Sequence, residues 1–130
     1  LRFRPSSGAL LVRSLEGGPE KEIASVFYTR YGLPNRHLDW SPDGKYLLIY
    51  AGPAGDKDIF RIDVDARTAA QLTNGGNNAA SSYSPDGEWI AFNSLRNDDQ
   101  ADLFIMRADG SSMRQITDNP EPDWQPQWEP

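Results

Sequence analysis

The sequence has no cysteine and a single histidine, His37, among its 130 residues. Disulfide bonds and cysteine-based zinc sites are therefore excluded, and so is a metal site built from several histidines. The longest apolar run, Tyr46 to Ala51, is far shorter than the roughly 18 residues that a membrane-spanning helix needs. No Gly-x-Ser-x-Gly segment is present, so the nucleophile elbow of serine hydrolases is absent. We expect no catalytic residue, no cofactor, no metal and no membrane insertion.

Positive charge is also scarce. The 13 Lys and Arg residues are outnumbered by 19 Asp and Glu residues, which gives a formal net charge of −6. This balance disfavours nucleic-acid binding, because such binding depends on neutralising phosphates with Lys and Arg. The absence of cysteine suits a reducing cytosol and an oxidising periplasm equally well, so composition leaves the compartment open.

A repeat of about 43 residues is the main feature of the sequence. Ser41-Pro42-Asp43-Gly44 returns 43 residues later as Ser84-Pro85-Asp86-Gly87, and an aromatic residue, Trp40 or Tyr83, precedes each copy. Two further segments return at an offset of 44, namely Asp58-Ile59-Phe60 as Asp102-Leu103-Phe104, and Gln71-Leu72-Thr73 as Gln115-Ile116-Thr117. Repeats of this length are typical of β-propeller blades.

Each period reads as four strands, because Pro-Asp-Gly turns and polar loops separate short apolar segments. The pattern predicts strands at 36–41, 45–51, 57–64 and 69–73, and again at 79–84, 88–94, 101–108 and 113–117. We therefore expect an all-β propeller of about three blades in one unit, 1–130. Its parts are a partial blade (1–35), two blades (36–76 and 77–118) and the first strand of a closing blade (119–130, chiefly Asp123–Trp128).

These segments resemble the TolB-like repeat, also called PD40, which is related to WD40. The shared pattern is an aromatic residue with Ser-Pro-Asp-Gly, an apolar strand, Asp-Ile/Leu-Phe and then Gln-Leu/Ile-Thr. The resemblance implies a six-bladed propeller and a periplasmic or extracytoplasmic location, with the cytoplasm as the open alternative. Similar blades occur in TolB, in propellers attached to prolyl-oligopeptidase-type peptidases and in sensor ectodomains, so the repeat specifies the fold more closely than the function.

Most of the polar residues in the repeat have a structural interpretation. Asp43 and Asp86 stand between Pro and Gly, where a side chain caps the reversal of the chain. Asn97-Asp98-Asp99, with Asp102 nearby, is expected to be a solvated loop, because it lacks the spacing of a calcium-binding loop. The recurring aromatic residues Trp40, Tyr83 and Trp128 are expected to fill the space between blades.

Binding residues are expected at the ends of the innermost strands, where long loops emerge on one face of a propeller. The residues that begin those strands and ring the channel mouth are Arg36, His37, Asn77, Asn78 and Asp123. Trp124 lies outside the aromatic register and is the best candidate for an exposed aromatic side chain. For His37, a hydrogen-bonding or packing role is the alternative to ligand contact.

Three functional hypotheses follow. The first is a non-catalytic scaffold that binds a protein or peptide through its loop face. The second is the propeller portion of a larger enzyme that controls access to a peptidase, and the third is a sensor domain for a small polar ligand. Three blades do not close a ring. Two interpretations of assembly therefore stay open: the chain is a piece of a longer protein, or two copies form a six-bladed homodimer.

Overall fold

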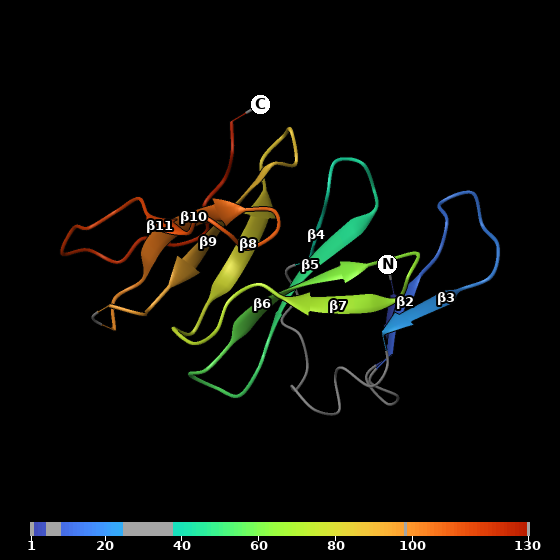
Figure 1. Cartoon of the computed structure of the whole chain (residues 1–130). Coiled ribbons are helices and arrows are strands. Elements are labelled where there is room, and N and C mark those ends of the chain that lie inside the picture. The colour runs from blue at the N-terminus through green and yellow to red at the C-terminus, as the bar shows by residue number, and fades with distance from the viewer. Residues whose placement is uncertain (1, 5–8, 25–37, 98, 130) are drawn as a thin grey trace.

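The computed structural model describes residues 2–4, 9–24, 38–97 and 99–129, which form three antiparallel sheets arranged in an arc (Figure 1). The first sheet has three strands in the order β1-β2-β3, and each of the other two has four. The bounds are β1 (Arg2–Arg4), β2 (Ala9–Val12) and β3 (Lys21–Ala24); β4 (Asp39–Trp40), β5 (Tyr46–Ala51), β6 (Asp58–Asp63) and β7 (Thr68–Gln71); and β8 (Ala79–Tyr83), β9 (Trp89–Ser94), β10 (Asp102–Arg107) and β11 (Arg114–Gln115). The expected all-β fold with four-stranded units is confirmed. In the described residues there is no helix long and apolar enough to cross a membrane.

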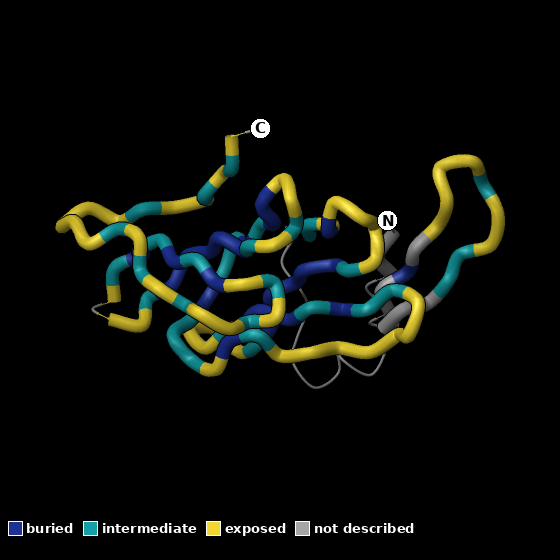
Figure 2. The backbone as a smooth tube through the Cα atoms, turned by 45° about the horizontal axis from the view of Figure 1, so that its top comes forward, coloured by how far each residue is buried: buried dark blue, intermediate teal, exposed yellow. Residues whose placement is uncertain are grey.

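The core consists of two clusters, one on each face of the second sheet. Leu47 and Ile49 of β5 point to one face of their sheet, and the alternate residues Leu48 and Tyr50 point to the other, as the period of two in a strand requires. The second face packs against the β8–β11 sheet, around the fully buried Phe92. Buried residues therefore follow the strands, while the loops at both ends are exposed (Figure 2).

The two Ser-Pro-Asp-Gly turns have the same internal hydrogen bonds. In the first turn, the Ser41 hydroxyl donates to Asp43 Oδ1 at 2.6 Å and accepts from the Tyr46 amide at 2.9 Å. In the second turn, Ser84 does the same with Asp86 and Trp89, at 2.5 and 3.0 Å. Gly44 and Gly87 have positive φ angles of 72° and 75°, a conformation that glycine adopts without strain. The repeated residues thus build the turn itself.

These turns make the stability of the fold depend on pH in the acid range. The hydrogen bond from the neighbouring serine hydroxyl lowers the pKa of Asp43 and of Asp86 below the ordinary 3.8, with the amide of Lys45 or Glu88 adding to the effect. A carboxylate whose pKa is lower in the folded state stabilises the fold above the unfolded pKa, and loses that contribution as pH falls through the folded pKa. We expect urea denaturation to show stability falling below about pH 4, and falling less steeply in a D43N/D86N double variant. An equally steep fall in that variant would contradict the assignment.

The C-terminal segment differs from its predicted form. Residues 116–129 include no strand, so the expected first strand at Asp123–Trp128 is wrong as a strand assignment. The segment nevertheless lies where that strand was expected, because the Asp123 amide donates to the Ala101 carbonyl as the Asn78 amide donates to the Lys57 carbonyl one period earlier. An extended segment becomes a strand only by pairing with a neighbouring backbone, and no described segment forms such a ladder with it.

Candidate functional site

The loop face is held together by a polar network centred on Asp58. Asp58 Oδ1 accepts from the Thr73 hydroxyl at 2.7 Å, from the Gly75 amide at 3.0 Å and from Asn78 Nδ2 at 3.2 Å. Its other oxygen accepts from Gln71 Nε2 at 3.1 Å. One carboxylate therefore ties the start of β6 to the end of β7 and to the loop that enters β8.

Part of this network returns in the last sheet. Gln115 Nε2 donates to Asp102 Oδ2 at 2.9 Å and to the Thr117 carbonyl at 2.6 Å, as Gln71 does with Asp58 and Thr73. The repeated Asp, Gln and Thr residues thus fasten the third strand of a blade to the fourth. Asp102 belongs to this fastening, and in the described residues no group of three or more acidic residues gathers to hold a metal ion.

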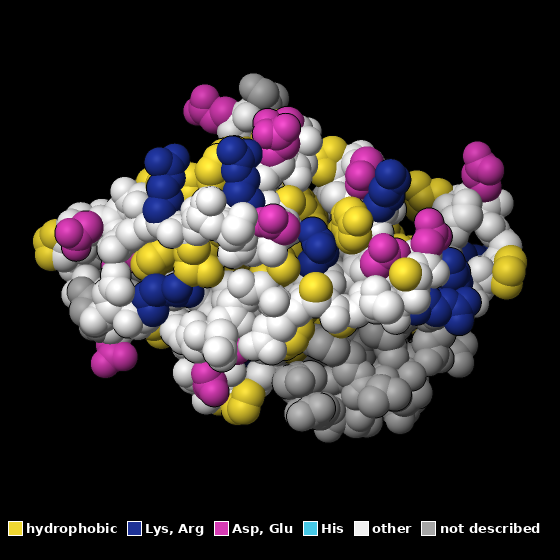
Figure 3. Space-filling model, in the orientation of Figure 1, with side chains coloured by type: hydrophobic (Ala, Val, Ile, Leu, Met, Phe, Trp, Pro, Cys, Tyr) yellow, Lys and Arg dark blue, Asp and Glu magenta, His cyan; other side chains and the backbone are white. Residues whose placement is uncertain are grey.

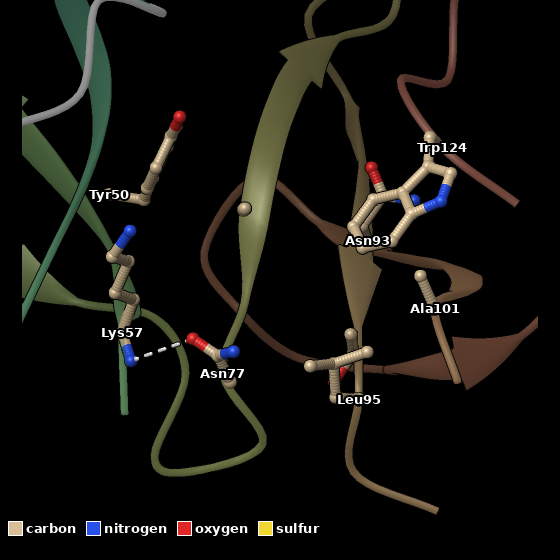
Figure 4. Close-up of a pocket in the computed structure, with 9 residues that line it drawn as sticks. Tyr50, Lys57, Asn77, Asn93, Leu95, Ala101 and Trp124 are labelled. Carbon is tan, nitrogen blue, oxygen red and sulfur yellow. Dashed lines mark hydrogen bonds between the residues drawn. The ribbon is translucent and has the colours of Figure 1, made fainter. Parts of the chain in front are cut away.

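A cavity of about 180 Å³ opens at this loop face, between the second and third sheets (Figure 4). Tyr50 and Lys57 of the second sheet lie on one side of it. Asn93 and Leu95, at the end of β9, lie on the other side together with Trp124. Asn77 lies between the two sides, and its Oδ1 accepts a long hydrogen bond of 3.4 Å from the Lys57 backbone amide.

The cavity combines one positive charge with aromatic surface. Lys57 Nζ lies 5.8 Å from the centre of the Tyr50 ring, and no ion pair of Lys57 is found in the described residues. Trp124 exposes 61% of its surface. An ammonium group without an ion pair attracts a carboxylate, and an exposed indole offers a flat apolar surface for a second group of the same ligand.

Asn93 positions Trp124. Its amide nitrogen donates to the Asp123 carbonyl, and its Oδ1 accepts from the Gln125 amide at 2.9 Å. The two bonds hold the backbone on both sides of Trp124, so the indole lies at the cavity rather than free in solvent. One period earlier, the position of Asn93 is occupied by Tyr50.

The predicted binding residues fall into four groups. Asn77 and Trp124 line the same cavity. Asn78 is fully buried, and its amide donates to Gly75 and Asp58 while its oxygen accepts from Arg96, so it shapes the loops from within. The Asp123 carboxylate accepts from Asn119. Arg36 and His37 lie outside the described residues, and their role stays a prediction.

Sequence reasoning missed Tyr50, Lys57 and Asn93. Tyr50 and Asn93 are the fifth residues of apolar strands, and the sequence alone does not say which blade a strand residue faces. A comparison of repeats contains one usable signal: asparagine replaces tyrosine at this position, although the preceding residue is apolar in both copies.

The repeat and its geometry agree with comparison to known proteins. The family model of the TolB beta propeller domain, PD40, matches residues 1–130. The chain belongs to this family. An uncharacterised protein of Agrobacterium fabrum is 44% identical over 96 residues, which cover 72% of this chain and 32% of that protein. The Tol-Pal system protein TolB of Anaeromyxobacter dehalogenans strain 2CP-C is 34% identical over 89 residues, or 68% of this chain and 20% of the relative.

Solved structures of TolB proteins share the fold. A structure provisionally assigned to TolB of Agrobacterium tumefaciens superposes with a TM-score of 0.72 at 34% identity, covering 91% of this chain and 40% of that one. TolB of Acinetobacter baumannii also gives a TM-score of 0.72, at 24% identity, covering 93% of this chain and 29% of that one. The chain thus spans about a third or less of the curated relatives that it matches.

Proposed function

We propose that this propeller segment is a non-catalytic scaffold that binds a protein or peptide at the loop-face cavity. The cavity carries the proposal, because it places the Lys57 ammonium group and the Tyr50 ring on one side, across from the exposed Trp124 indole. Aromatic side chains flanked by polar groups are typical of residues that dominate protein interfaces. The partner we propose presents a carboxylate next to an apolar or aromatic side chain.

Location and assembly are part of the same proposal. Relatives are named as proteins of a Tol-Pal system, and that name supports a binding role and an extracytoplasmic location for this chain. A homodimer that closes a six-bladed ring stays a prediction. Charged side chains of both signs are spread over the face seen in Figure 3, so the visible surface does not suggest a partner of uniform charge.

Binding to an array of synthetic peptides tests the proposal. The array varies the number of acidic and aromatic residues independently, and we expect the full chain to retain peptides that have both. The variants W124A and K57M should each lower the affinity for the retained peptides roughly tenfold, because each removes one anchoring contact. The matched control is W40A, which removes a partly exposed tryptophan next to the first Ser-Pro-Asp-Gly turn, outside the cavity. Peptides that bind W124A and K57M as tightly as the parent chain would contradict the proposed site.

A further inference from the structure

Two departures from the repeat meet at the opposite end of the same inter-sheet junction. Arg61 occupies the position that is Ile105 in the last blade, since Arg61 pairs with Leu48 and Ile105 pairs with Ala91, which lies one period after Leu48. Tyr83 occupies the aromatic position that is Trp40 one period earlier. A guanidinium and a phenolic hydroxyl thus stand where the repeat elsewhere has an isoleucine and an indole. Both residues line a cavity of about 370 Å³ beside the two Ser-Pro-Asp-Gly turns.

The Tyr83 hydroxyl is an unpartnered polar group in the core. Tyr83 is 7% exposed, and its hydroxyl has no hydrogen-bond partner among the residues that the structure describes. Burial raises the pKa of this phenol well above its usual value, so the hydroxyl keeps its proton at neutral pH and is a hydrogen-bond donor. Buried polar groups are nearly always paired, and an exception in a cavity indicates that something else supplies the partner.

Arg61 brings further donors to the same cavity. Its Nη1 donates to the Ala108 carbonyl at 2.8 Å, and its guanidinium lies 4.7 Å from the centre of the Tyr46 ring. These contacts fix the plane of the guanidinium and engage one of its five N–H groups. In the described residues, no other hydrogen bond or ion pair of Arg61 is found. A carboxylate is the acceptor that fits a fixed guanidinium together with a phenolic O–H.

The rim of the cavity carries the opposite charge. Asp43 and Asp86 line it, and the hydrogen bonds from Ser41 and Ser84 lower the pKa of both carboxyl groups, so both are charged at neutral pH. One oxygen of each carboxylate is engaged by its own turn, and the other has no hydrogen bond or ion pair among the described residues. Two carboxylates repel a ligand that is only an anion and attract one that also carries an ammonium group.

We propose that the cavity between the two Ser-Pro-Asp-Gly turns binds a small zwitterion of the α-amino-acid type. Its carboxylate accepts from Arg61 and from the Tyr83 hydroxyl, and its ammonium group lies toward Asp43 and Asp86. The site is separate from the loop-face cavity and shares no residue with it.

Calorimetric titration of the full chain with L-alanine tests this inference, with acetate and methylammonium as the two half-ligands. We expect L-alanine to bind at least about tenfold more tightly than either half-ligand, because only the zwitterion engages both ends of the site. Absence of heat up to about 100 mM L-alanine, well above the millimolar Kd that a few such contacts support, would overturn the proposal. Equal binding of acetate would also overturn it.

Two variants locate the binding. Y83F removes only the hydroxyl and should weaken the binding of L-alanine roughly tenfold. The stability of the free chain should not change, because no internal hydrogen bond is lost. R61I restores the residue of the last blade and should abolish binding. If R61I does not fold, Y83F decides. Unchanged affinity in Y83F, or a high-resolution structure grown with L-alanine in which a water molecule alone meets the Tyr83 hydroxyl, would refute the site.

Discussion

Phe92→Ala is expected to remove about 3–5 kcal/mol from the free energy of unfolding, which is much of the stability of a domain of this size. Phe92 is 0% exposed and stacks on Phe104, with ring centres 5.8 Å apart. It belongs to the cluster in which Leu48 and Ile59 of the second sheet meet the third sheet. The cavity left by its ring would lie at the junction between blades, where no backbone ladder compensates for lost packing.

Urea denaturation monitored by circular dichroism measures the effect. The matched control is Ile116→Ala, because Ile116 is an apolar side chain directly after β11 that is 52% exposed, and its loss should change stability by no more than about 0.5 kcal/mol. The inter-sheet core as described would be contradicted if the Phe92 variant unfolded at nearly the same urea concentration as the Ile116 variant.

The elements that the sequence predicted well are those set by local chemistry. Pro-Asp-Gly determines a reversal within four residues, so Ser41–Gly44 and Ser84–Gly87 have the same hydrogen bonds in both copies. Short runs of apolar residues that follow the Pro-Asp-Gly turns locate β5 and β9, because a strand that is buried on both faces has such a run. Because the same turn and strand recur after about 43 residues, the repeat then indicated a propeller fold.

The site was harder to predict because it depends on how strands of different blades pack against each other. Trp124 and Asn77 were predicted as binding residues, yet Lys57 and Tyr50 complete the cavity from a different blade. The aromatic series shows the same limit: Tyr83 is buried between sheets, as expected, whereas Trp40 at the equivalent position is 37% exposed. Periodicity gives the position of a residue within its own blade. Whether that residue is buried depends on how the neighbouring blade packs against it.

Asn78 shows how a residue at the predicted channel mouth acts through its neighbours. The replacement Asn78→Ala is expected to lower the free energy of unfolding by about 2–4 kcal/mol, because buried groups would lose their hydrogen-bond partners. Asn78 Nδ2 lies 2.9 Å from the Gly75 carbonyl and 3.0 Å from the Thr73 hydroxyl, and Asn78 Oδ1 accepts from Arg96 Nη2 at 2.9 Å. A methyl group replaces none of these contacts.

The matched control for Asn78→Ala is Asn77→Gly at the adjacent position. Asn77 has a φ of 48°, which glycine adopts freely, and its side chain makes one long contact of 3.4 Å with Lys57. We expect the Asn77 variant to lose less than about 1 kcal/mol, since little is left unpaired. Hydrogen exchange adds a local measurement: faster exchange of the Gly75 and Asn78 amides in the Asn78 variant alone would show that the loop between β7 and β8 opens when its buried amide is removed. If both variants were equally stable, Asn78 would not be the structural centre of this loop, and its side chain would return to the list of candidate binding residues.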